Sequence, residues 1–211
     1  MKTFHDRTDA GEQLTEVLRH RGIERPVVLG IPRGGVVVSV VVAAGLSAQH
    51  GVVVARKLGA PTQPELAIGA VTASGIAFVD HGLAEMSGAN EQYLEAELAH
   101  QIGEAKRREA EFDGQHNPSV AGQTVIIVDD GVATGATAIA AIRSMKAQGA
   151  ERVIFATPVG PTSTIAALRR EADEVVCLRV ESDFYAVGQF YDDFQPIEDR
   201  EVKSLLEASE S

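Results

Sequence analysis

The second half of the chain alternates between short apolar runs and Ala-rich segments, and this alternation constrains the fold more than any other feature. The runs Thr124–Val128, Glu151–Thr157 and Glu174–Val180 are rich in valine and isoleucine and predict buried strands. The segments between them, Gly135–Gln148 and Pro161–Glu171, predict helices. Because alternating strands and helices form parallel sheets covered on both faces, we expect an α/β fold with a doubly wound, mostly parallel sheet.

The first half begins with the same alternation and then departs from it. We expect a helix over Thr8–Arg21, a buried strand over Pro26–Ile31, a helix over Gly34–Gly45 and a strand over Gly51–Ala55. The next segment, Ala60–Glu65, contains two prolines and no apolar residue larger than alanine. Such a composition predicts an exposed, mobile loop.

Several other segments fall outside the predicted sheet. A hairpin is expected over Leu66–Thr72 and Gly75–Asp80, and a long charged helix from Ser87 or Asn90 to Phe112. Gly114–Gly122 is a polar connector, and the tail Glu181–Ser211 holds five of the ten Phe and Tyr residues. We therefore expect one domain over 1–211, with a core at about 22–180, a loop, hairpin and helix region at 58–113, and a hood formed by 181–211 with the N-terminus.

Charge and cysteine content narrow the function classes. The 19 Lys and Arg against 30 Asp and Glu give a net charge of -11. This balance argues against a general nucleic-acid binder and against a partner of anionic membranes. The single cysteine, Cys177, excludes an internal disulfide. The longest apolar run, Val36–Leu46, is too short to cross a bilayer, and the first residues do not form a signal peptide, so we expect a cytoplasmic protein.

The stretch Val125–Thr137, VIIVDDGVATGAT, carries the clearest chemical signal. An apolar strand ends in the adjacent carboxylates Asp129 and Asp130, and a loop of Gly, Ala and Thr then opens an Ala-rich helix. Such a turn presents backbone N–H groups and the positive end of a helix dipole to a phosphate, and Thr134 and Thr137 add hydroxyl donors. The carboxylates suit a diol or Mg²⁺. A diol beside a phosphate is a ribose 5-phosphate.

Other interpretations of this stretch fit less well. In receiver domains an Asp pair also follows an apolar strand, but it lies near the N-terminus, and a phospho-accepting Asp ends a later strand. Here the next strand closes with Ala156, Thr157 and Pro158. The stretch lacks G-x-G-x-x-G, and no Lys follows Gly135, so neither a dinucleotide fingerprint nor a nucleoside-triphosphate loop is present. A purely structural turn is the remaining alternative.

This stretch resembles the phosphoribosyl-diphosphate (PRPP) signature of type I phosphoribosyltransferases. Ile31–Gly35, after the first predicted strand, is similar to the short pyrophosphate loop of that family, and Arg56 with Lys57 matches its basic position after the second strand. Pro61–Ala73 falls where the family has a mobile loop. The similarity covers residues 26–195 and is strongest to a group of stand-alone bacterial phosphoribosyltransferase-like proteins.

The resemblance implies a role for each of these residues. The two aspartates would hold the ribose hydroxyls, with Mg²⁺ as the cofactor bound directly or indirectly. The 5-phosphate and the pyrophosphate would each be held by one set of loop residues. The implied 5-phosphate site comprises Ala133, Thr134, Gly135, Ala136 and Thr137, and the implied pyrophosphate site comprises Arg33, Gly34, Gly35, Arg56 and Lys57. The groups acting in catalysis would be Asp129, Asp130, Lys57 and Arg33, with Asp130 as the candidate general base. As ordinary alternatives, Arg33 would be a surface residue and Arg56 with Lys57 a solvated strand end.

The acceptor is less clearly marked than the PRPP site. Phe184–Gly188 with Tyr191 and Asp192 is similar to the segment of 6-oxopurine transferases that stacks the purine and contacts its edge. Tyr185 would stack, and Asp192 would accept a hydrogen bond. Pro158–Gly160 departs from that pattern, because it lacks the lysine that reads a 6-oxo group. The aromatic residues are equally consistent with the core of a small lobe.

Two functions therefore follow from the sequence. The first is a Mg²⁺-dependent phosphoribosyltransferase of nucleotide salvage, which transfers ribose 5-phosphate from PRPP to a purine-like or other nitrogenous base and releases pyrophosphate. The second is a PRPP-binding regulatory protein without catalysis. Lys57 and the predicted mobile loop favour the enzyme, because only chemistry requires the leaving group to be held and water to be excluded. We expect a homo-oligomer, most simply a dimer.

Overall fold

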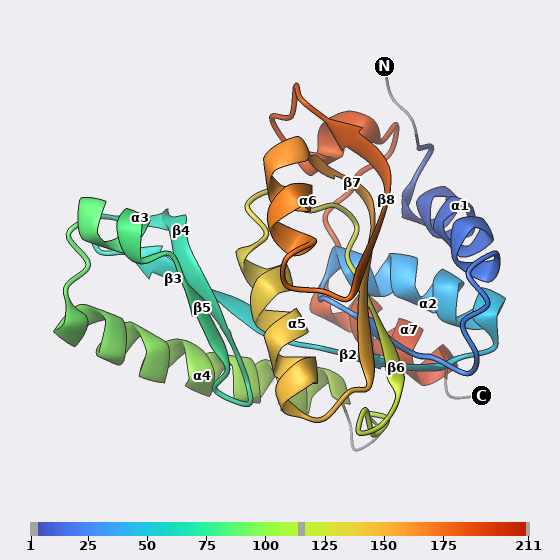
Figure 1. The fold of residues 1–211 in the computed structure, drawn as a ribbon, viewed down its shortest axis with the longest axis horizontal. Helices are drawn as coiled ribbons and strands as arrows, with labels where there is room; N and C mark the ends of the chain where they lie inside the picture. Colours follow the sequence, from blue (N-terminus) through green and yellow to red (C-terminus); the bar gives the residue numbers. More distant parts are fainter. Residues whose placement is uncertain (1–3, 114–116, 210–211) are drawn as a thin grey trace.

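A five-stranded parallel sheet forms the centre of the computed structural model, which describes residues 4–113 and 117–209 (Figure 1). The strand order is β2-β1-β6-β7-β8, and each neighbouring pair is parallel. The strands are β1 (Val27–Gly30), β2 (Gln49–Val52), β6 (Thr124–Val128), β7 (Arg152–Pro161) and β8 (Glu174–Glu181). The predicted α/β class and parallel sheet are confirmed.

Helices cover both faces of this sheet. The helices α1 (Arg7–Arg19) and α2 (Gly34–Leu46) lie on one face, and α5 (Ala136–Ala147) and α6 (Thr162–Leu168) on the other (Figure 1). The central strand β6 shows the consequence: Ile126 packs with α1 and α2, whereas its neighbours Val125 and Ile127 pack with α5 and α6. Because both faces are buried, the strand is a continuous apolar run.

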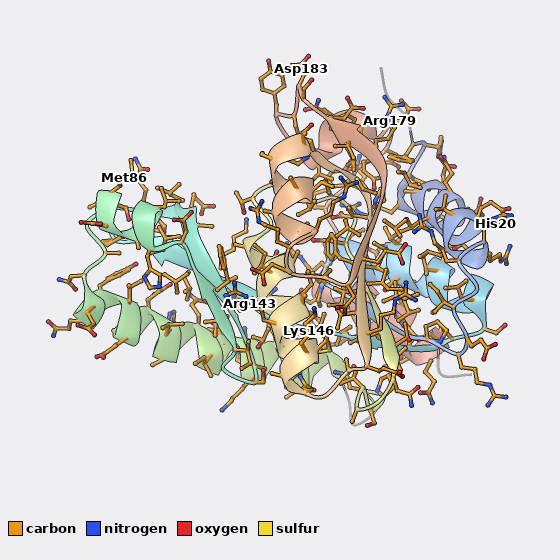
Figure 2. All side chains as sticks on the ribbon, viewed as in Figure 1. His20, Met86, Arg143, Lys146, Arg179 and Asp183 are labelled. Atoms are coloured by element: carbon orange, nitrogen blue, oxygen red, sulfur yellow. The ribbon has the colours of Figure 1, made fainter. Side chains whose placement is uncertain are left out.

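A second, antiparallel sheet projects from the first as a lobe. It contains β3 (Ala55–Ala60), β4 (Gln63–Thr72) and β5 (Ala77–Val79), with α3 (His81–Met86) and α4 (Glu91–Asp113) packed on it. Figure 2 shows Met86 at the outer end of this lobe, away from the central sheet, where the residue is 86% exposed. We call this unit the β3–β5 lobe.

The expectation of a loop at Ala60–Glu65 is wrong. Ala60 ends β3 and pairs with Gln63 at the start of β4, so only a two-residue turn separates the strands. The polar and proline residues of this segment are exposed at the end of a hairpin, and their composition therefore reflects solvent contact and not a missing strand. The same hairpin places Arg56 and Lys57 within β3, and most of Pro61–Ala73 within β4.

The hood packs against the N-terminal segment. It contains the 3₁₀ helix η1 (Val187–Phe190), and Phe4 pairs with Tyr191 through a parallel bridge with ring centroids 5.3 Å apart. The C-terminal helix α7 (Asp199–Ser209) packs on α2 and β2. The predicted connector Gly114–Gly122 includes residues 114–116, which lie outside the described residues. No helix within the described ranges is long and apolar enough to span a membrane.

His50 makes the stability of the folded chain depend on pH. On β2, its Nε2 lies 2.7 Å from the Ser39 hydroxyl of α2, and burial lowers its pKa from 6.5 to about 4. The unfolded chain therefore binds a proton at a higher pH than the folded chain does. We expect the free energy of unfolding to fall as the pH drops from about 6.5 to about 4, by on the order of 2 kcal/mol.

Urea unfolding at pH 7 and pH 4.5 checks this expectation. His50→Gln should flatten the pH dependence, whereas the control His20→Gln, at the exposed position directly after α1, should leave it unchanged. An identical pH dependence in wild type and His50→Gln would contradict the assignment.

Candidate functional site

The site begins where the central strand ends. Asp129 and Asp130 follow β6 directly, and both are partly buried. The Asp130 N–H donates to Asp129 Oδ1 at 2.9 Å, and the Asp129 N–H donates to the Ala156 carbonyl at 3.2 Å. The pair therefore lies beyond the carboxyl end of the middle strand, where open α/β sheets bind ligands.

Burial and mutual repulsion make this pair electrostatically costly. Burial raises the pKa of Asp129 well above 3.8, the Asp130 charge raises it further, and Lys57 opposes the shift. Burial also raises the pKa of Asp130, while the Arg7 guanidinium counteracts it. Two cations from distant segments thus offset two adjacent carboxyl groups. Ligands that supply hydroxyl donors or a cation would relieve the remaining charge.

Hydrogen bonds from neighbouring elements fix the loop after the pair. The Val132 N–H donates to the Val159 carbonyl at 2.9 Å, and the Thr164 hydroxyl donates to the Ala133 carbonyl at 2.6 Å. Gly135 has a φ of 81°, a left-handed conformation that favours glycine, and α5 begins at the next residue. The first N–H groups of α5 have no acceptor within the helix, so they are available to an anion.

A second loop, Pro32–Gly35, lies against the acidic pair. The Ile31 N–H donates to the Val128 carbonyl at 2.9 Å, and the Pro32–Arg33 peptide bond is cis. A Cβ on Gly34 would collide with the Asp130 carboxylate, and one on Gly35 would lie 2.7 Å from the Val128 carbonyl oxygen. Both glycines are therefore required by close approach to the end of β6.

Cations from three elements face the same space. Arg56 and Lys57 come from β3, and the Arg56 Nε donates to Gln101 Oε1 at 3.2 Å. Arg33 precedes α2, and Arg108 lies on α4; each has a guanidinium nitrogen within 4 Å of the Asp199 carboxylate, at 3.8 and 3.9 Å. The lobe and the central sheet thus contribute separate cations to one cleft.

The cleft has a volume of about 780 Å³. It is lined by ten of the residues that the sequence assigned to the site: Arg33, Gly34, Arg56, Lys57, Asp129, Asp130, Ala133, Thr134, Gly135 and Thr137. Gly35 and Ala136 are buried beside it. The predicted acceptor residues Tyr185 and Asp192 do not line it, and Tyr185 is 92% exposed. A smaller cavity of about 250 Å³, lined by Thr72, Ser74 and Ser144 among others, shares none of these residues.

Several residues of the site are not identified by the sequence analysis. Arg7 contacts Asp130, and Arg108, Tyr93 and Gln101 line the cleft from α4. The α4 residues carry no local signal, because only the lobe brings that helix to the site. Arg7 does carry a local signal, because the helix dipole disfavours a cation in the first turn of a helix. An arginine at that position therefore indicates an anionic partner outside the helix. Within the described ranges, no three His, Cys, Asp or Glu side chains gather as a metal site.

Gly34→Ala should destabilise the protein, because the added methyl group would meet the Asp130 carboxylate and would lie 2.9 Å from Arg7 Nε. We expect a loss of about 1–3 kcal/mol in urea unfolding. Gly103→Ala is the matched control, since its Cβ meets nothing within 4 Å on α4, and it should be neutral or stabilise by up to about 1 kcal/mol. Equal stability of the two variants would contradict the proposed close contact.

Comparisons with known proteins agree with this geometry. The family model described as phosphoribosyl transferase domain matches residues 6–195. Rv0571c of Mycobacterium tuberculosis is 42% identical over 208 residues, which are 98% of this chain and 47% of the relative. The chain thus spans about half the length of the curated relatives that it matches.

Solved structures extend the comparison. TT1426 of Thermus thermophilus is 41% identical, with a TM-score of 0.82 and 97% of each chain covered. A hypothetical protein of Neisseria gonorrhoeae with bound ppGpp shares the fold at 13% identity and a TM-score of 0.55, over 99% of this chain and 97% of that one.

The family match therefore covers the sheet, the acidic pair and both loops of the cleft. The resemblance drawn from Val125–Thr137 is confirmed over most of the chain. The chain belongs to the phosphoribosyl transferase domain family, and its fold is that of the type I phosphoribosyltransferases.

Proposed function

We propose that this chain transfers ribose 5-phosphate from PRPP to a nitrogen of a base and releases pyrophosphate. The observation that supports this most strongly is the single cleft lined by an acidic pair, a phosphate loop and at least three cations. These are the groups that PRPP, with its diol, 5-phosphate and pyrophosphate, would need. Membership of the family gives independent support.

The reaction is a substitution at ribose C1. The bond from C1 to the pyrophosphate oxygen breaks, a bond from C1 to the base nitrogen forms, and the nitrogen loses its proton. Positive charge develops on the ribose ring and negative charge on the leaving group. Catalysis then rests on positioning and on electrostatic stabilisation, and no covalent nucleophile is needed.

The PRPP would lie across the cleft from β6 to the lobe. The N–H groups at the start of α5, with Thr134 and Thr137, would bind the 5-phosphate. Asp129 and Asp130 would accept hydrogen bonds from the ribose hydroxyls, and Asp130 is the candidate base for the nitrogen proton. The pyrophosphate would be held by Arg33, Gly34, Gly35, Arg56 and Lys57, with Arg108 as an addition.

The donor set fits Mg²⁺ bound together with substrate. Two adjacent, partly buried carboxylates supply hard oxygen ligands, and Mg²⁺ commonly takes one or two carboxylates with substrate oxygens and water. Asp129 and Asp130 would hold the ion through the ribose hydroxyls or directly. When bound, Mg²⁺ would neutralise charge on the pyrophosphate.

The base would enter between the phosphate loop and the hood. Val187 of η1 lines the cleft and packs against Gly131, where an added Cβ would collide with its Cγ1. A purine-like acceptor remains our proposal, although Tyr185 and Asp192, the residues that the resemblance implied for it, do not line the cleft. The proposed homodimer and the cytoplasmic setting are likewise predictions.

Calorimetric titration of PRPP with Mg²⁺ tests the binding site. We expect micromolar binding by the wild type, and a loss of at least about 100-fold in Asp129→Asn/Asp130→Asn, because the amide groups cannot accept the diol or ligate Mg²⁺ equally. Asp183→Asn, an exposed aspartate of the hood, is the matched control and should bind like the wild type. A folded wild-type protein without PRPP affinity would overturn the proposal.

A panel of bases with a pyrophosphate-release assay separates the enzyme from a regulatory PRPP-binding protein. With the base that gives turnover, Lys57→Ala should lower kcat by about 100-fold, since its charge would stabilise the leaving group most in the transition state. Lys146→Ala, which removes an exposed lysine paired with Asp173, should leave kcat unchanged. PRPP binding without release for any base would favour the regulatory function.

A further inference from the structure

Arg7 is the most unusual cation near the site, because it comes from the N-terminal helix, far from the acidic pair in the sequence. It lies in the first turn of α1, and its Nε donates to Asp130 Oδ2 at 2.7 Å across 123 positions of sequence. The two side chains are 9% and 14% exposed. A contact of this length between charged groups is a strong hydrogen bond, and both partners are largely removed from water.

The Arg7 guanidinium has further partners, all in the hood. One terminal nitrogen donates to the Gln195 carbonyl at 2.9 Å, and the guanidinium carbon lies 3.8 Å from the centre of the Phe194 ring. The ring of Phe194 in turn lies 4.9 Å from that of Tyr191. The Arg7 guanidinium is therefore held by three contacts, to Asp130, Gln195 and Phe194, and these contacts fix its orientation toward Asp130.

Asp130 is held from its other sides as well. The Tyr191 hydroxyl donates to the Asp130 carbonyl at 2.5 Å, and Gly34 lies against the carboxylate. Asp130 lines the cleft and its Oδ2 accepts from Arg7, so Oδ1 is the carboxylate oxygen that Arg7 does not occupy. The carboxylate thus has one oxygen committed to the protein, and its plane is set by Arg7.

We propose that Arg7 is a positioning residue, which orients Asp130 so that Oδ1 accepts a ribose hydroxyl of PRPP. This inference rests on the proposed function. Arg7 does not line the cleft, so it would act through Asp130 and not by touching the substrate. Arg7 and Tyr191 together connect the hood to Asp130, and of the two only Arg7 contacts the carboxylate.

A double-mutant cycle between Arg7 and Asp130 tests this role, with PRPP and Mg²⁺ as the titrated probe. Arg7→Gln should weaken PRPP binding about tenfold or more in the wild-type background, in line with the loss of a hydrogen bond to a charged group. In the Asp130→Asn background the same change should alter affinity by less than about threefold, because the residue through which Arg7 acts is then changed.

Two further variants separate positioning from simple stability. Arg7→Lys keeps the charge but not the fixed fork of donors, and should recover part of the affinity that Arg7→Gln loses. Arg19→Gln removes an arginine from the last turn of the same helix and should leave PRPP affinity unchanged. Thermal unfolding of each variant shows whether it is folded at the titration temperature, and Arg7→Lys serves as the test variant where Arg7→Gln is not.

The outcomes are distinct. Equal loss of affinity from Arg7→Gln in both backgrounds would show that the residue acts independently of Asp130 and would overturn the inference. Unchanged affinity in folded Arg7→Gln and Arg7→Lys would do the same while leaving the proposed function intact. Absence of PRPP binding by the wild type would overturn the proposed function and this role together.

Discussion

The structure depends on keeping two carboxyl groups side by side at the end of a buried strand. Asp129 and Asp130 repel one another and lose solvation, and neither effect is offset by the sheet itself. Two cations from outside the central sheet counteract this cost. Lys57 comes from the β3–β5 lobe, and Arg7 comes from the N-terminal helix. The β3–β5 lobe and α1 thus each place one of these cations near the end of β6.

The central part of the fold and most of the cleft could be predicted from the sequence because their signals are local. The apolar run before Asp129 and the glycine-containing loop after it specify strand, turn and helix within thirteen residues. The Arg33–Gly35 loop is recognisable for the same reason. The strand that ends at Val128 also carries its pairing preference in its composition, since valine and isoleucine suit a sheet buried on both faces.

The remaining parts depend on contacts that no local pattern encodes. Ala60–Glu65 is polar and rich in proline, yet pairing between Ala60 and Gln63 makes it a hairpin. Arg108 reaches the cleft only because α4 packs along β3, and Arg7 reaches Asp130 only because Phe4 pairs with Tyr191 of the hood. Tyr191 illustrates the same limit: its aromatic character is evident, but its hydrogen bond to Asp130 follows from tertiary packing.

The residues that line the cleft come from two different sheets. The groups suited to the ribose and its phosphate belong to the central sheet, whereas Arg56 and Lys57 belong to a separate sheet with its own small core. The two sheets meet at α5, where Ala136 and Ala140 pack against Ala70 of β4. The spacing between the two halves of the cleft therefore depends on how the lobe packs against this helix, and a change of side-chain size at that contact would alter the width of the cleft.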